Sequence, residues 1–178
     1  MKLRRFMFGA AMMAVALALS AQATLSDGGR ERLQRQVRHE LNMLPYGNVF
    51  DYLTFTIDAD GNVTLNGDVT NPVVKSSAGN VVKRVEGVEH VDNQIRVLPV
   101  SFMDDGLRLR LFRTIYGYPA LQKYALGLNK PIRIIVNGGH VTLIGVVDNQ
   151  TDKNIVGIRA NGVPGIFSVD NQLAVVKD

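Results

Sequence analysis

The residues of this sequence best suited to acid–base or metal chemistry are three histidines, His39, His90 and His140. Metal-binding histidines on one helix are typically four residues apart, whereas these are separated by 51 and 50 residues. The chain has no cysteine, which excludes a thiol nucleophile and a cysteine-ligated metal. It also lacks a Gly-x-Ser-x-Gly turn and a glycine-rich phosphate loop. We therefore expect solvated histidines, no catalytic residue, no metal, no cofactor and no enzymatic activity.

A polar triplet, Asp-Asn-Gln, occurs twice, at residues 92–94 and 170–172. A carboxylate beside an amide is one way to build a binding site. Such side chains also bond to nearby backbone groups, and a binding role would require the same site in both halves of the chain. We interpret both triplets as structural elements that precede a final strand.

The first 23 residues have the order of a secretory signal peptide. Lys2, Arg4 and Arg5 form a positive start, an uncharged apolar run follows, and small residues stand at Ala21 and Ala23. The apolar run is shorter than the roughly 20 residues that a membrane-spanning helix needs. We predict a signal peptide over 1–23, cleavage after Ala23, a periplasmic location and no transmembrane span after processing. An uncleaved anchor is the alternative.

The basic character of the chain comes largely from this leader. The chain has 20 Lys and Arg against 16 Asp and Glu, and three of the basic residues but no acidic one precede residue 24. The remainder is therefore close to neutral, which gives no reason to expect a nucleic-acid partner. Without cysteine, an exported domain must be held by its apolar core rather than by disulfides.

The rest of the chain is an internal duplication. Residues 61–97 align without a gap on residues 139–175, with 16 identities in 37 positions. The upstream segments align at a shift of 74, which places Leu33 and Val37 on Leu107 and Leu111. We predict two modules, residues 30–98 and 104–177, joined by a linker from Pro99 to Asp104.

Each copy has the pattern α-β-β-α-β. In copy 1, a helical stripe is followed by two alternating strands, a second helical stripe and a last strand. The apolar positions are Leu33, Val37, Leu41 and Leu44; Leu53, Phe55 and Ile57; Val63, Leu65 and Val69; Val74, Ala78, Val82 and Val85; and Val91, Ile95 and Val97. A helix between the second and third strands allows these strands to pair in parallel. The predicted class is α+β: two tandem modules, each a three-stranded mixed sheet with two helices on one face.

Paired glycines mark the places where the backbone needs special geometry. Gly61 and Gly139 follow the predicted hairpin turns, where glycine supplies a positive φ. Gly67 and Gly145 lie in the second strand, where we expect close backbone packing, and Gly87 and Gly165 follow the second helix. We assign all six a structural role.

These motifs resemble the BON domain, named for bacterial osmotic stress and nodulation. The resemblance rests on Val63-Thr64-Leu65-Asn66-Gly67, on Gly87-Val88, on Val91-Asp92-Asn93-Gln94-Ile95-Arg96-Val97 and on their second copies. It implies a non-enzymatic protein of the periplasm or outer membrane, concerned with envelope maintenance, anionic phospholipid binding or support of envelope proteins under stress, including osmotic stress. Some double-BON proteins are lipoproteins, and the absence of cysteine separates this chain from them.

The two copies differ most on the first helix. Arg35, Arg38 and Asn42 of copy 1 correspond to Leu109, Phe112 and Tyr116 of copy 2, so polar side chains are replaced by apolar and aromatic ones. We expect these to form an outward apolar stripe bordered by arginines, and the predicted lipid- or partner-binding residues are Arg108, Leu109, Arg110, Phe112, Arg113 and Tyr116. Coverage of the stripe by copy 1 is the alternative.

The sequence therefore predicts an exported, non-enzymatic binding protein of the bacterial envelope that associates with an anionic phospholipid surface through its second module. The alternative is a periplasmic chaperone-like or scaffold protein for envelope proteins that has no lipid affinity. A module that binds a small molecule or peptidoglycan is a third interpretation.

Overall fold

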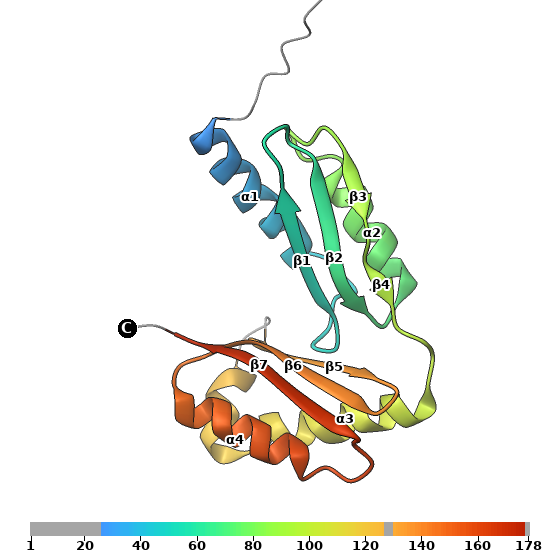
Figure 1. Cartoon of the computed structure of the whole chain (residues 1–178), viewed down its shortest axis with the longest axis vertical. Helices are drawn as coiled ribbons and strands as arrows, with labels where there is room; N and C mark the ends of the chain where they lie inside the picture. Colours follow the sequence, from blue (N-terminus) through green and yellow to red (C-terminus); the bar gives the residue numbers. More distant parts are fainter. Residues whose placement is uncertain (1–25, 127–129, 177–178) are drawn as a thin grey trace, which may run out of the picture.

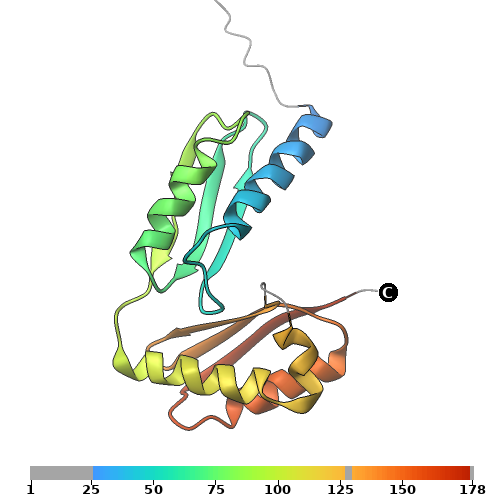
Figure 2. The same cartoon turned by 180° about the vertical axis from the view of Figure 1, so that it is seen from behind.

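The computed structural model describes residues 26–126 and 130–176. The predicted signal peptide and its cleavage site lie outside these residues. Two modules follow one another along the chain, each with a sheet on one side and helices on the other (Figures 1 and 2). No helix in the described part of the chain is long and apolar enough to cross a membrane.

Module 1 has the predicted α-β-β-α-β order. Its elements are α1 (Asp27–Asn42), β1 (Tyr52–Ile57), β2 (Val63–Val69), α2 (Pro72–Val82), β3 (Val91–Asn93) and β4 (Arg96–Val97). The side chain of Ser26 caps α1 by accepting from the Gly29 N–H, and Asn71 caps α2 in the same way with Pro72 as the first helical residue. β2 pairs antiparallel with β1 and parallel with both β3 and β4.

Module 2 repeats this order and adds a short 3-10 helix. Its elements are α3 (Phe102–Tyr116), η1 (Pro119–Ala125), β5 (Ile132–Asn137), β6 (His140–Val147), α4 (Gln150–Asn161) and β7 (Ser168–Val175). β6 pairs antiparallel with β5 and parallel with β7. The duplication in the sequence is thus a duplication in the fold.

Each module has its own apolar core between sheet and helices. Leu33 and Val37 of α1 and Leu107, Leu111 and Ile115 of α3 are fully buried, as their aligned spacing predicts. The core of module 1 is completed by aliphatic side chains of its sheet and of α2, and the core of module 2 is larger because η1 adds to it.

Three boundaries differ from the sequence predictions. α2 ends at Val82 rather than at Gly87, which lies in the following turn. α3 begins at Phe102, inside the predicted linker. The polar triplets overlap the last strands instead of preceding them: Asp92 and Asn93 end β3, and residues 170–172 lie in β7. In module 1 the last strand is interrupted at Gln94 and Ile95, which divides it into β3 and β4.

The glycines of the second strands sit against another backbone. Gly67 and Gly145 have φ values of 127° and 136°. A Cβ atom at Gly67 would lie 2.0 Å from the Tyr52 carbonyl oxygen, and one at Gly145 would lie 1.8 Å from the Pro131 carbonyl oxygen. Only glycine permits the first two strands of each module to approach in this way.

We expect Gly67→Ala and Gly145→Ala each to lower the free energy of unfolding by about 3 kcal/mol or more, because the added methyl displaces a strand and the positive φ is strained. Gly28→Ala is the matched control, since nothing lies within 4 Å of its Cβ position. Denaturant unfolding measures all three. Unchanged stability in the two strand variants would refute the close-packing argument.

Candidate functional site

The predicted binding residues lie on α3, and two of them face inward. Tyr116 is 4% exposed, and its hydroxyl donates to the Ile132 carbonyl at 2.6 Å and accepts from the Ile132 N–H at 3.1 Å. Burial raises the pKa of Tyr116 to about 12, although the hydrogen bond to Ile132 opposes this shift. This tyrosine holds the first residue of β5 against α3.

Arg108 is likewise 4% exposed. One guanidinium nitrogen donates to the Val136 carbonyl at 2.6 Å, and another pairs with Asp105 at 2.5 Å. Asp104 accepts from the N–H groups of Gly138 and Gly139 at 2.8 and 2.9 Å. Arg108 and Asp104 therefore attach α3 to the β5–β6 hairpin.

The expectation of an outward stripe running from Leu109 through Phe112 to Tyr116 is therefore wrong at Tyr116, and Arg108 does not border it. Residues on a helix are offset by 100°, so Arg108 points to the same side as Leu111 and Ile115. An arginine on the buried face of a helix needs a hydrogen-bond partner inside the protein. The spacing of Arg108 from Leu111 and Ile115 already placed it on that face in the sequence.

Phe112 is half-buried at the junction of the two modules. Its ring lies 6.3 Å from the ring of Phe50 in an edge-to-face arrangement and 5.1 Å from the ring of Tyr116. The same segment of module 1 reaches the free edge of β5, where the Val49 carbonyl accepts from the Ile134 N–H at 3.0 Å. Coverage by module 1, the alternative interpretation of the stripe, thus applies to Phe112.

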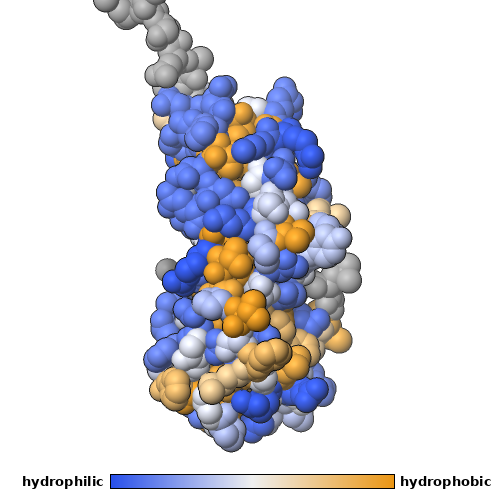
Figure 3. Space-filling model, turned by 90° about the vertical axis from the view of Figure 1, so that its right-hand side faces the viewer, coloured by the Kyte–Doolittle hydropathy of each residue, from blue (hydrophilic) through white to orange (hydrophobic). Residues whose placement is uncertain are grey.

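The outward face of α3 is formed by other residues. Phe102 is 93% exposed and Leu109 is 50% exposed, and Arg110 and Arg113 are exposed beside them. Positions 102, 109 and 113 follow helical spacing and so share one side of α3. Neither arginine forms an ion pair within the described residues. On the side where the linker and the start of α3 lie, apolar surface gathers over module 2 and the junction (Figure 3).

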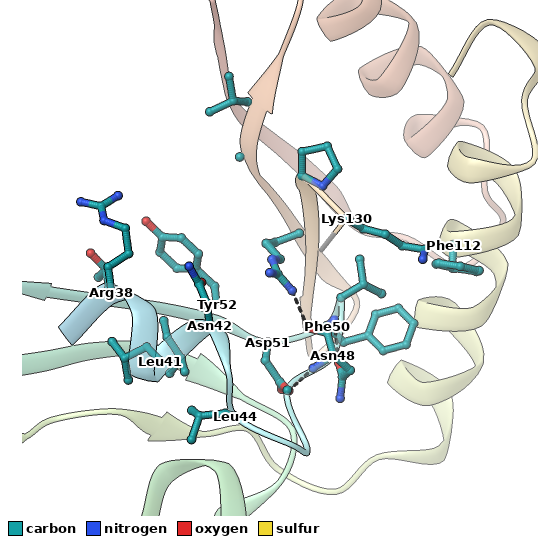
Figure 4. Close-up of a pocket in the computed structure, with 18 of the residues that line it drawn as sticks. Arg38, Leu41, Asn42, Leu44, Asn48, Phe50, Asp51, Tyr52, Phe112 and Lys130 are labelled. Atoms are coloured by element: carbon teal, nitrogen blue, oxygen red, sulfur yellow. Dashed lines mark hydrogen bonds between the residues drawn. The ribbon is translucent and has the colours of Figure 1, made fainter. Parts of the chain in front are cut away.

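A groove of about 900 Å³ lies between the modules. Module 1 contributes the end of α1, the following segment and β1; module 2 contributes α3, the start of β5 and the end of β6. Figure 4 shows Arg38 and Lys130 on opposite sides of it. Asp51 is the acidic side chain that lines it, and this carboxylate is buried and accepts from the Asn48 N–H and from both the N–H and the hydroxyl of Thr70.

The histidines and the two polar triplets are the other residues that the sequence offered for chemistry. His39, His90 and His140 are exposed, and no group of three or more His, Asp or Glu side chains in the described part of the chain is placed to hold a metal ion. Asn93 and Asn171 each donate to the carbonyl of a lysine on the second helix, at 2.8 and 2.9 Å. Both triplets therefore tie a strand to a helix.

A polar network in module 2 was not anticipated from the sequence. Lys123 lies 2.6 Å from the Asp148 carboxylate and 2.7 Å from that of Asp152, and the Tyr124 hydroxyl donates to Asp152 at 2.6 Å. Burial opposes ionisation of Asp152, but the hydrogen bonds from Lys123 and Tyr124 outweigh it and lower its pKa. This network fastens η1 to the start of α4.

The comparisons with known proteins bear on the fold first. The BON domain model matches residues 30–99 and 122–177. The chain belongs to the BON domain family. Each matched segment lies in one α-β-β-α-β module, so the protein contains two BON modules. None of the curated proteins compared with the chain matches it.

Two solved structures are also similar to this double-BON chain. Both are of CdsD from Chlamydia trachomatis, which is described as a structural protein of the Type III secretion system; one is its C-terminal domain. Each is 15% identical to this chain, covers 82% of it and has a TM-score of 0.31, and the matches span 92% and 98% of those chains. A likeness this weak supports no inference about function.

The BON family is a family of non-enzymatic binding domains found in the bacterial envelope. The motifs that define it here are glycines and aliphatic residues, which shape the backbone and the core. These motifs therefore do not themselves assign a binding surface.

We expect Phe112→Asp to lower the free energy of unfolding by about 1–3 kcal/mol, because it places a carboxylate against Phe50 and Tyr116. Leu109→Asp, on the same helix but half-exposed, is the control and should cost much less. Thermal unfolding of both variants tests this contact. Equal stabilities would show that Phe112 is not part of the junction.

We expect Asp152→Asn to lower the free energy of unfolding by about 1–3 kcal/mol at neutral pH. The folded-state pKa of Asp152 lies below its unfolded value of 3.8, so its stabilising effect is complete above that value and is lost as the pH falls through the folded pKa. The difference between wild type and variant should therefore shrink in acid. Asp148→Asn, which removes a more exposed partner of Lys123, is the control; a gap independent of pH would contradict the prediction.

Proposed function

We propose that this protein is an exported, non-enzymatic binding protein of the bacterial envelope that associates with anionic phospholipid surfaces through module 2. The observation that carries the proposal is the outward face of α3, where Phe102 and Leu109 lie in line with Arg113 and beside Arg110. An exposed aromatic side chain enters the acyl boundary, and neighbouring arginines contact the headgroups.

The exposed apolar side chains continue past the start of α3. Val100 in the linker and Met103 in the first turn are also exposed. Asp104 and Asp105, the acidic residues in that turn, are engaged with the hairpin and with Arg108, so the outward face carries a positive charge. Each Lys or Arg near an anionic surface contributes on the order of 1 kcal/mol, which gives weak and salt-sensitive association.

Membership of the BON family supports the more general part of this proposal, namely that the protein is a binding protein of the periplasm or envelope. The second candidate is a chaperone-like or scaffold protein for envelope proteins. It is favoured by the same exposed Phe102, because a bulky apolar side chain at a helix start also suits a protein partner.

Co-sedimentation with phosphatidylglycerol vesicles separates the two candidates. We expect Phe102→Asp, and separately the pair Arg110→Gln and Arg113→Gln, to reduce vesicle binding by about tenfold while leaving the unfolding midpoint unchanged, since these side chains are exposed. Wild-type binding should fall with added salt and be weak on phosphatidylcholine vesicles.

Arg32→Gln with Arg35→Gln is the matched control, because it removes two exposed arginines from the first helix of module 1. Vesicle binding should survive this change. If the wild-type protein ignores anionic vesicles at low salt, the lipid proposal fails and the scaffold candidate replaces it.

A further inference from the structure

The groove between the modules has apolar walls. Leu41 lines it at the end of α1 and Leu44 just after that helix. Leu53 lines it from β1, and Val146 of β6 lines it from the open face of the second sheet. The alternate residues of β6 are buried on the core face of the sheet, whereas Val146 lies on the opposite face and is 47% exposed. An aliphatic side chain is therefore left uncovered inside a concave site.

The duplication shows that this apolar wall is particular to module 2. Val146 pairs in register with Ala174, and the equivalent pair in module 1 is Asp68 and Arg96. Asp68 and Arg96 form a bidentate ion pair, with N–O distances of 2.5 and 3.0 Å. The same backbone register thus holds a charge pair in one module and two apolar side chains in the other.

The rest of the open sheet face changes in the same direction. Ile144 stands where module 1 has Asn66, and Ile135 stands where module 1 has Thr56. A solvated sheet face normally keeps polar side chains, as that of module 1 does. Ile135 is itself buried, so the larger aliphatic side chains that this face leaves accessible are Val146 and, in part, Ile144. Aliphatic side chains at these positions beside a groove favour an apolar ligand there.

The charge of the groove is positive. Arg38, Lys130 and Arg133 line it, whereas the carboxylate of Asp51 is already occupied by three hydrogen bonds within module 1. Arg38 lies over the ring of Phe55 at 5.9 Å, and Arg133 donates to the Asn48 carbonyl at 2.9 Å. A ligand that fits has an apolar part and an anionic group.

We propose that the groove between the modules binds one molecule of an anionic single-chain amphiphile, with its alkyl chain against Val146 and the leucines of module 1 and its phosphate or carboxylate at one of the two cations that border the groove on opposite sides, Lys130 or Arg38. The volume of the groove falls within the range of about 300–1,000 Å³ that is typical of small-molecule sites. This proposal does not rest on vesicle association, because it concerns a single dissolved molecule and a different set of residues.

The decisive variant transfers the ion pair of module 1 into module 2, as Val146→Asp with Ala174→Arg. The register is the same in both modules, so the new pair should form without disturbing the sheet, and it leaves the net charge unchanged. We expect this variant to bind 1-palmitoyl-lysophosphatidylglycerol at least about tenfold more weakly than wild type, measured by calorimetry below the micelle concentration.

The mirror variant, Asp68→Val with Arg96→Ala, is the matched control, because it makes the reverse exchange at positions that do not line the groove. It should bind the lysolipid like wild type. Unfolding curves of both variants show whether the fold is kept, and methyl NMR shifts at Leu53 and Val146 locate the ligand in the wild-type protein.

The double variant Arg38→Gln with Lys130→Gln tests recognition of the anionic headgroup. We expect this pair to remove the preference for lysophosphatidylglycerol over lysophosphatidylcholine. Palmitate binding as tightly as the lysolipid would identify any anionic head as sufficient, and weaker palmitate binding would identify the phosphate as the recognised group. Inorganic phosphate alone should not shift the methyl resonances.

Several results would overturn the proposal. No binding of monomeric lysolipid, or equal affinity in the Val146→Asp, Ala174→Arg variant, would do so. So would a dimer of the free protein that occludes the groove. Phe102→Asp should retain lysolipid binding, and the groove variant should retain vesicle binding, so this proposal and the vesicle proposal fail independently.

Discussion

The contact between the segment before β1 and the edge of β5 determines which surfaces this protein presents. The Ile134 N–H would be an unpaired donor at a sheet edge, and the Val49 carbonyl satisfies it. Phe50 follows immediately and packs on Phe112. One short segment therefore closes an edge strand, covers an aromatic side chain of α3 and forms part of the groove wall.

Duplication allows the two modules to be compared position by position. Glycines that permit close strand approach, and asparagines that tie the last strand to the second helix, are retained in both. Other positions have diverged, including one in the interior of the module. Val74, a core residue of module 1, is replaced by Asp152, which joins the network that secures η1. The shared backbone tolerates this because each change is compensated locally.

Two kinds of apolar surface result in module 2. The outward side of α3 is convex and bordered by arginines, which suits a flat anionic surface. The groove is concave and has aliphatic walls, which suits a single flexible chain. Leu109 belongs to both surfaces, since it is half-exposed on α3 and also lines the groove. The two surfaces thus adjoin each other while depending on different charged residues.

The sequence by itself determined the duplication, the order of elements, the parallel pairing of the last strand and most of the core, because each follows from periodicity and from glycine geometry within one module. Leu107, Leu111 and Ile115 are buried as their spacing predicts. Tertiary structure alone decided the burial of Phe112 and Tyr116 and the partner of Arg108. These depend on the Phe50 ring, the Ile132 backbone and the Val136 carbonyl, which come from elsewhere in the chain, and helical periodicity carries no information about such distant partners.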